Sequence, residues 1–478
     1  MTVAGYLVSI FYALACIGGA GVLYKLGCPK TVTRKFVHIL VGFEWVILNR
    51  FMGNSIHFLA VALALTAVLA IEYRLKIFKM MSSDADNAPG TVYYAVAMSI
   101  MSALTLAVPE MSVPFGIGVF CTSFGDGFAG LIGSAVKRGN PRIYGNKSLV
   151  GTLAGLTVSF ITTAVISLSF SYPLVWWQWL AIAFLSSALE LVFGYGLDNI
   201  AVTLGTAGLA YAFVYFPAIS DYLVPILLTP LFVGFAYKKK ALTLFGVIAA
   251  VAVDLAISVS LGNFGFITLA AFFVGGIAAD KFKKKHKKSK QSSEKPHECR
   301  RAIQVVSNAL AAAIAALLFL VTSNKLFAVA FVAAMAEALA DTVASGIGSS
   351  SARVYDIARF RRCEPGLSGG VSLSGTLSSL VASLLLSAVA ICFGVLTPAE
   401  SAIAAAAAFI GVMIDSILGS LIQAKYRCAV CGRIVERREH CDATATRISG
   451  ISLVNNDAVN LISNIITAAV AIALATLI

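Results

Sequence analysis

The sequence predicts an all-α integral membrane protein of about sixteen transmembrane helices in two homologous repeats that share one orientation. Hydrophobic residues make up 59% of the 478 positions and charged residues only 12%, and the mean hydropathy is +0.88. A chain of this composition cannot cover itself with polar groups in water, so it must expose apolar groups to lipid. A pair of similar acidic motifs, one in each half of the chain, predicts the repeats.

The predicted helices are apolar runs of roughly 18 to 25 residues, which is the length that crosses a hydrocarbon layer of about 30 Å. The runs lie near residues 3–24, 36–53, 55–74, 91–108, 112–136, 149–170, 174–193, 199–216, 220–237, 241–260, 263–280, 302–322, 325–348, 371–395, 399–422 and 450–477. The first run has no basic segment before it, so we expect a spanning helix there rather than a cleavable leader.

The charges predict which face of the protein is cytosolic. If the runs alternate in direction, 34 of the 36 lysines and arginines fall on one face, all except Arg50 and Lys325. The positive-inside rule makes that face cytosolic. The formal net charge of +13 then indicates contact with anionic lipid headgroups and anionic substrates, and no separate basic domain favours nucleic acid. Cysteines on a cytosolic face are expected to stay reduced rather than form a disulfide framework.

The two acidic motifs are SFGDGFAGLIGS at 123–134 and ALADTVASGIGSS at 338–350, which align Asp126 with Asp341. Further pairs follow in the same order along both halves: RKFVH (34–38) with RRAIQ (300–304), SLVGTL (148–153) with SLSGTL (372–377), and LDNI (197–200) with VNNDAVN (454–460). Repeated order of this kind predicts two homologous units. The alternative is chance similarity among helices rich in alanine, glycine and serine.

The repeats predict two domains, residues 1–217 and 218–478, with the junction near 218–237. The second domain also contains a basic loop at 281–301 and a cysteine-rich loop at 425–449. We expect the basic loop to be a solvated cytosolic linker that touches lipid phosphates.

Asp126 and Asp341 lie inside apolar runs, where an ionised carboxylate costs several kcal/mol unless it faces a hydrated cavity and a cation. Both are therefore predicted to be catalytic and to bind Mg²⁺. The glycines around Asp126, such as Gly125, could break the helix and let the backbone approach a phosphate. They could instead be small-residue contacts between helices.

The loop after each acid is cationic and ends in a helix start with glycine and hydroxyl residues, a combination that binds anions through free backbone amides. An acid followed by such a loop predicts a site for a nucleoside triphosphate with Mg²⁺, although the chain has no Walker-type P-loop. The predicted phosphate-binding residues are Arg34, Lys35, Gly125, Lys147, Ser148, Gly151, Thr152, Arg301, Arg361, Arg362, Ser368, Gly369, Gly370, Gly375, Thr376, Asn455 and Asn456.

Further acids end neighbouring helices. Glu190, Asp198 and Asp415 are predicted to be catalytic, with helix capping as the alternative. His38 lies one helical turn after Arg34 and could accept a proton or orient a hydroxyl. Its counterpart in the second half is Gln304, which cannot take a proton. This asymmetry suits a first half that activates an alcohol and a second half whose acceptor is already ionised.

The motifs resemble two enzyme families. RKFVHILVG, SFGDGFAGLIGS, YGNKSLVGT and ELVFGYGLDNI resemble the phytol kinase and dolichol kinase family of CTP-dependent membrane prenol kinases, over roughly residues 1–216. ALTLFGVIAA, RRAIQVVSNA, ALADTVASGIG, LSGGVSLSGT, IDSILGSLIQ and LVNNDAVN resemble the phytyl-phosphate kinase family, over roughly 220–478. One departure is Gly346, where the second family commonly has glutamate.

The resemblance implies two successive phosphorylations, in which a long-chain isoprenoid alcohol of the phytol or geranylgeraniol type becomes its monophosphate and then its diphosphate. It implies CTP as the donor, Mg²⁺ as the metal and active sites that face the cytosol. Two other functions remain open. A lipid cytidylyltransferase shares a GDxxA segment but has an HGGxxDRxD-type ending that this chain lacks, and a secondary transporter could use intramembrane acids on two repeats.

The cysteine-rich loop contains Cys428, Cys431, His440 and Cys441, a set of three thiols and an imidazole that suits a tetrahedral structural Zn²⁺ site. Because His440 and Cys441 are adjacent in the chain, we expect them to be strained as two ligands of one ion. Reduced thiols without a metal and a redox switch are the alternatives.

Overall fold

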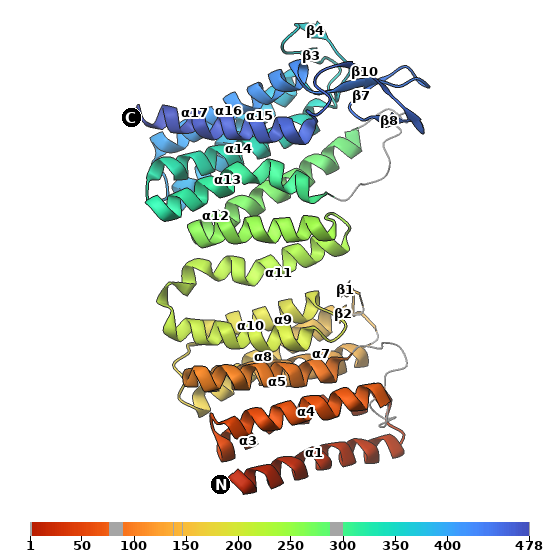
Figure 1. Ribbon diagram of the computed structural model, residues 1–478, viewed down its shortest axis with the longest axis vertical. Helices are drawn as coiled ribbons and strands as arrows, with labels where there is room; N and C mark the ends of the chain where they lie inside the picture. The colour runs from red at the N-terminus through yellow and green to blue at the C-terminus, as the bar shows by residue number, and fades with distance from the viewer. Residues whose placement is uncertain (1, 76–88, 137, 146, 287–299, 478) are drawn as a thin grey trace. The chain divides into compact units, whose positions relative to one another are not determined.

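The computed structural model describes residues 2–75, 89–136, 138–145, 147–286 and 300–477, and most of the predicted basic loop lies outside these ranges (Figure 1). The chain divides into two compact units, Met1–Phe235 and Ala236–Ile478. This boundary falls inside the range 218–237 where the repeats place the junction.

The first unit consists of helices and one small hairpin. Its helices are α1 (Thr2–Lys25), α2 (Lys30–Leu40), α3 (Glu44–Met52), α4 (Ile56–Leu75), α5 (Gly90–Ala107), α6 (Ser112–Phe120), the π-helical turn η3 (Cys121–Asp126), α7 (Gly127–Ala135), α8 (Leu149–Ser169), α9 (Trp176–Val192), α10 (Asp198–Tyr215) and α11 (Leu223–Lys238), which contains the boundary. Strands β1 (Arg142–Tyr144) and β2 (Lys147–Ser148) pair antiparallel just before α8.

The second unit is a helical bundle with short strands at one end (Figure 1). Its helices are α12 (Leu244–His286), α13 (Ala302–Thr322), α14 (Lys325–Gly348), α15 (Leu373–Cys392), α16 (Pro398–Leu421) and α17 (Asn456–Ala475). The strands are β3 (Tyr355–Asp356), β4 (Arg361–Arg362), β5 (Gly370–Val371), β6 (Lys425–Arg427), β7 (Ile434–Val435), β8 (Glu439–His440), β9 (Ala443–Thr444) and β10 (Thr446–Ser449). They form sheets in the orders β4-β3-β5, β10-β6-β7 and β8-β9.

Within the described residues, twelve helices are long and apolar enough to cross a membrane, and α9 is a shorter apolar helix. The predicted run at 36–53 is a bent segment in which a 3₁₀ turn separates α2 from α3. The predicted run at 199–216 corresponds to α10, whose start is polar because it contains Asp198 and Asn199. The predicted runs at 241–260 and 263–280 form α12, which counts as one helix although its backbone breaks at Gly262, with φ of 55°. The fold class is all-α and membrane-spanning, as predicted.

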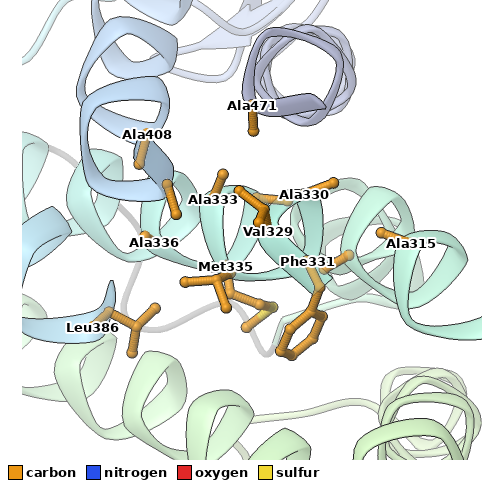
Figure 2. Packing of buried hydrophobic residues seen from close by; sticks show 14 of the residues in the cluster. Ala315, Val329, Ala330, Phe331, Ala333, Met335, Ala336, Leu386, Ala408 and Ala471 are labelled. Carbon is orange, nitrogen blue, oxygen red and sulfur yellow. The ribbon is translucent and has the colours of Figure 1, made fainter. Parts of the chain in front are cut away.

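The core of the second unit is organised around α14, which contacts all five other helices of its bundle. Residues Ala328 to Ala340 of α14 are buried without interruption. Figure 2 shows Phe331 and Met335 directed to the side of α14 opposite Ala471 of α17, and the Phe331 ring lies 5.9 Å from that of Phe264 in α12. The alanines on α14 let its neighbours approach closely, which is how helices gain packing contacts where lipid supplies no hydrophobic driving force.

Both units contain the same close contact between two helices. In the first unit, a Cβ added to Gly151 of α8 would lie 2.8 Å from the carbonyl oxygen of Ala129 in α7. In the second, a Cβ added to Gly375 of α15 would lie 3.1 Å from the carbonyl oxygen of Ala344 in α14. These four residues occupy matching positions in the two motif sets, so the sequence similarity is accompanied by matching local packing.

Glycine contacts of this kind make a prediction for stability. A Cβ at Gly118 in α6 would lie 2.3 Å from the backbone carbonyl oxygen of Thr203 in α10, so neither helix can relieve the overlap by rotating a side chain. We expect Gly118→Ala to lower the free energy of unfolding by about 1–3 kcal/mol. Gly208→Ala in α10 is the control, because no atom lies within 4 Å of its added Cβ. Thermal unfolding of both variants in detergent measures the difference, and equal melting temperatures would contradict the packing assignment.

Candidate active site

Asp126 ends a π-helical turn inside a continuous helical segment. The backbone keeps right-handed helical angles at Phe120, at Asp126 and at Gly127 beyond it. The prediction that glycines break this helix is therefore wrong. The turn is wider than an α-helical turn, and single π-turns inside α-helices are frequent at functional sites. The added Cβ of Gly125 would lie 2.3 Å from Ser159 Oγ in α8, so this glycine serves helix packing, the alternative reading of the motif.

Two side chains of α2 hold the Asp126 carboxylate. Lys35 Nζ lies 2.7 Å and His38 Nε2 lies 3.2 Å from Asp126 Oδ2. Lys35 passes over Gly130, whose added Cβ would lie 2.7 Å from Lys35 Cε. His38 Nε2 also lies 3.1 Å from the carbonyl oxygen of Thr122. Both neighbours of this nitrogen are acceptors, so Nε2 carries a proton, and in the neutral ring Nδ1 is the nitrogen without one.

Lys147 holds two more of the predicted acids. Its ammonium group pairs with Glu190 Oε1 at the end of α9 and lies 3.6 Å from Asp198 Oδ2 at the start of α10. Burial alone lowers the pKa of Lys147, but Glu190, Asp126 and Asp198 together hold this pKa well above its ordinary value. Because the Asp126 charge also raises the pKa of Lys147, the ion pairs around Asp126 lie close enough to interact electrostatically with those around Lys147. Residues from five separate segments thus form one group of three acids and three basic side chains, which we call the Asp126 cluster: Lys35, His38, Asp126, Lys147, Glu190 and Asp198.

The start of α8 differs from the expected anion site. Its first three amides already donate within the chain: Leu149 N to the Pro141 carbonyl, Val150 N to Asn140 Oδ1 and Gly151 N to Ser148 Oγ, at 2.9 to 3.3 Å. The hydroxyl of Thr152 is buried and has no hydrogen-bond partner among the described residues. Free amides at this helix start are therefore not the anion donors in this structure. The cationic side chains Lys35 and Lys147 are the groups that can receive a phosphate.

The second unit contains an acid that the sequence reasoning missed. Glu337 lies one helical turn before Asp341 on α14, and it is buried with 3% exposure. Asn464 Nδ2 donates to Glu337 Oε2 at 2.7 Å. The hydroxyl of Ser463 lies 2.9 Å from Glu337 Oε1 and 3.1 Å from Asp415 Oδ2. One hydroxyl has a single proton to donate, so it cannot satisfy both carboxylates at once.

We call Glu337, Asp341 and Asp415 the Glu337 cluster. Within the described residues, no lysine or arginine forms an ion pair with any of the three. The Asp126 cluster, in contrast, contains two lysines. The signal for Glu337 was present in the sequence as a single glutamate within an alanine-rich run, MAEALAD, four residues from Asp341. Aligning the two halves does not reveal Glu337, because the matching position in the first unit is Thr122, which is not an acid.

Polar residues near the Glu337 cluster have structural partners. Gln304 Oε1 accepts from the backbone amide of Arg301 at 2.9 Å, which caps α13. Asn455, predicted to bind phosphate, caps α17 by accepting from Ala458 N. Asn456 Nδ2 lies 3.4 Å from Asn460 Oδ1. These residues shape the ends of helices next to the acids.

The predicted phosphate loop of the second unit packs on the end of α16. Gly369 has φ of +86°, and its added Cβ would lie 2.6 Å from Ser420 Cβ. Ser420 Oγ donates to Asp356 Oδ1 at 2.6 Å. Burial raises the pKa of Asp356, but this hydroxyl and the amides of Arg359 and Ala358 hold it below its ordinary value. Gly370 pairs with Asp356, while Ser368 bonds to the cysteine-rich loop.

The remaining predicted phosphate-binding residues lie around the same loop or in α2. Arg361 and Arg362 form the exposed strand β4. Gly375 N donates to Ser372 Oγ, and Thr376 N donates to the Ser372 carbonyl oxygen. Arg34 precedes Lys35 in α2.

Comparison with known proteins places the chain in a family. Residues 227–468, about half of the chain, match the model of the integral membrane protein family DUF92. The chain belongs to this family. Members of DUF92 are described as integral membrane proteins, which agrees with the twelve candidate spans.

Named relatives of this DUF92 protein include one enzyme and two plant proteins. A phytol kinase of Synechocystis sp. is 31% identical over 198 residues, which cover 39% of this chain and 81% of the relative. Protein VTE6 of Arabidopsis thaliana, a chloroplastic protein, is 33% identical over 170 residues, covering 34% of this chain and 51% of the relative. Protein PGR of Arabidopsis thaliana is 30% identical over 139 residues, covering 27% and 47%. The chain thus spans about half the length of the two plant proteins. No solved structure matches the chain.

The ion pairs of the Asp126 cluster predict coupled effects on stability. Lys147→Met leaves Glu190, whose side chain is 6% exposed, without its cation. We expect this change to lower the free energy of unfolding by about 2 kcal/mol, because a buried charge left alone keeps its desolvation cost while Lys147 itself is partly solvated. Lys147→Met combined with Glu190→Gln is expected to recover at least half of the loss. A double-mutant cycle of thermal unfolding in detergent measures this coupling, and additive losses would contradict the ion pair.

Proposed function

We propose that this DUF92 protein is a membrane isoprenoid kinase with one phosphoryl-transfer site in each unit. The observation that carries the proposal is the Asp126 cluster, in which two lysines, a histidine and three acids from separate segments of the first unit lie together. Kinase chemistry needs cations for the donor phosphates, carboxylates for a metal and a group to receive the acceptor's proton. The similarity to a relative named phytol kinase supports the same reaction class.

In the first unit, Lys35 and Lys147 are proposed to neutralise the phosphates of a nucleoside triphosphate, with CTP as the donor that the sequence resemblance implies. Asp126, Glu190 and Asp198 offer oxygen ligands, which suit Mg²⁺. When bound, the metal adds positive charge beside the transferring phosphoryl group. The acceptor is a long-chain isoprenoid alcohol whose apolar chain remains in lipid and whose hydroxyl reaches the cluster.

The proton of the alcohol is proposed to move to Nδ1 of His38, either directly or through a water molecule. The alcohol oxygen forms a bond to the γ-phosphorus while the bond between that phosphorus and the β,γ-bridging oxygen breaks. The products are the lipid monophosphate and the nucleoside diphosphate. Asp126 holds Nε2–H of His38, which keeps the imidazole oriented and stabilises its protonated form.

The second unit is proposed to phosphorylate the lipid monophosphate. Its acceptor is already ionised near neutral pH, so this site needs no general base, in line with Gln304 at the position that matches His38. Glu337, Asp341 and Asp415 have no lysine partner among the described residues, and Glu337 and Asp415 share the Ser463 hydroxyl, which favours a divalent cation among the three acids. On this proposal both sites face the cytosol, where the positive-inside rule places the basic loops.

Separate sites predict separable activities. Asp126→Asn in the full chain is expected to reduce phosphorylation of the alcohol at least 100-fold and to leave phosphorylation of the monophosphate intact. Asp341→Asn is expected to do the reverse. The measurement uses purified protein, labelled CTP, Mg²⁺ and isoprenoid alcohols of graded chain length, and resolves mono- from diphosphate products. Asp221→Asn, an exposed acid in the first unit, is the control.

The nucleotide product separates the kinase from the cytidylyltransferase in the same assay. Release of CDP supports the kinase. Release of pyrophosphate with a CDP-linked lipid would overturn the kinase proposal, and loss of both activities in each single variant would overturn separate sites.

A further inference from the structure

The four metal-ligand candidates of the cysteine-rich loop come together from two turns. Cys428 and Cys431 lie in the turn after β6, which is closed by bonds from Cys428 N to the Arg433 carbonyl and from Gly432 N to the Cys428 carbonyl, at 3.0 and 2.9 Å. Gly432 has φ of +69°, which glycine adopts without steric cost. This conformation turns both sulfur atoms to the same side of the loop.

The second turn solves the problem of adjacent ligands. Strands β8 and β9 pair His440 with Ala443. The two residues between them, Cys441 and Asp442, have φ of 53° and 55°, as in a hairpin turn with two left-handed residues. This sharp reversal brings Cys441 Sγ to 3.2 Å from Nδ1 of the preceding histidine. The sequence predicts strain between these neighbours as joint ligands, and the two positive φ angles provide a backbone conformation in which both ligand atoms lie close together.

The ligand atoms converge on one point. Cys431 Sγ lies 3.5 Å from His440 Nδ1, and the ligand atoms of Cys428, Cys431, His440 and Cys441 all lie within 4.8 Å of one another. Three sulfurs and one imidazole nitrogen in this arrangement are the ligand set of structural zinc sites, in which zinc–sulfur bonds are about 2.3 Å. A disulfide would use only two of the sulfurs, would leave His440 unexplained and would need an oxidant.

We propose that Cys428, Cys431, His440 through Nδ1, and Cys441 bind one structural Zn²⁺ ion. On binding, the three thiols release their protons to solvent, so the filled site carries one net negative charge. The same loop also carries the exposed arginines Arg437 and Arg438, so its other side chains add positive charge to this part of the protein. This site is separate from the Glu337 cluster, and it does not depend on the proposed kinase function.

The metal would also fix a segment next to the Glu337 cluster. Between the two ligand turns, Glu436 Oε1 accepts from Ser368 N at 2.6 Å, and Lys425 Nζ, just before Cys428, donates to the Ser368 carbonyl oxygen at 2.8 Å. The loop therefore holds both backbone groups of Ser368. Because Gly369, the next residue, packs on Ser420 of α16, the zinc site positions this segment against the helix that contains Asp415. The role of the zinc ion is structural, because four protein ligands leave no coordination position for a substrate.

The first test is metal content. Full-length protein purified in detergent is expected to contain one zinc per chain by elemental mass spectrometry, and its Co²⁺ form is expected to show thiolate charge-transfer bands and the intense visible bands of a tetrahedral site. Cys428→Ser and Cys441→Ser are expected to lower zinc content at least fivefold. Cys392→Ser, an exposed cysteine in α15, is the matched control and should keep the metal.

Two further measurements distinguish a variant that has lost a zinc ligand from a variant that does not fold. His440→Cys keeps four ligands, so it should retain zinc where His440→Ala does not. Chelation of wild-type protein should speed tryptic cleavage after Arg437 and Arg438 at least fivefold, and added Zn²⁺ should reverse this. Three results would overturn the proposal. The wild-type protein could lack zinc even when zinc is added during expression, its Co²⁺ form could lack the expected bands, or mass spectra could show a disulfide between these cysteines.

Discussion

The negative charges of carboxylates buried among the helices must be balanced, and the arrangement of the surrounding side chains follows from this need. A carboxylate that leaves water loses several kcal/mol of solvation, and the loss must be offset by a cation or by hydrogen-bond donors. In the first unit, Lys35 and Lys147 offset the charges of Asp126 and Glu190. One glycine serves this need directly, since Gly130 leaves space for the stem of Lys35 where α2 lies against α7.

The two units meet this constraint differently. Val371 occupies the position that matches Lys147, so the second unit lacks that cation at the corresponding helix start. Two of its acids, Glu337 and Asp415, accept hydrogen bonds from neutral groups, the Asn464 amide and the Ser463 hydroxyl. Neutral donors bring no positive charge to the cluster, and in the proposed function a bound divalent cation would supply it. Gly151 and Gly375 thus pack in the same way in the two units, although acids are held by lysines in the first unit and by neutral donors in the second.

Much of the candidate site could be predicted from sequence because its residue types are rare in membrane helices. The sequence singles out Asp126 as an acid inside an apolar run and Glu190 and Asp198 as acids at helix ends. In the structure Lys35 and His38 contact Asp126, and Lys147 contacts Glu190 and Asp198. Glu337 was missed because repeat matching favours positions that agree between halves, and the two units differ there.

Other features could not be predicted because they depend on hydrogen bonds and dihedral angles that composition does not specify. The amides at the start of α8 appeared free in the sequence, yet Asn140 and Ser148 occupy two of them. The π-helical turn before Asp126 and the positive φ of Cys441 are decided by tertiary contacts and hairpin geometry. The glycine pattern predicted close backbone approach correctly, but the approaching partner is another helix rather than a phosphate.

In the proposed function, a metal-bound triphosphate meets the lipid acceptor at the Asp126 cluster. The decisive experiment is an electron cryomicroscopy structure of the full chain with Mg²⁺ and a non-hydrolysable CTP analogue. We expect phosphate density in contact with Lys35 and Lys147 and metal density at the Asp126 carboxylate. Nucleotide bound elsewhere in the first unit, with the Lys35–Asp126 and Lys147–Glu190 pairs unchanged, would contradict this proposal.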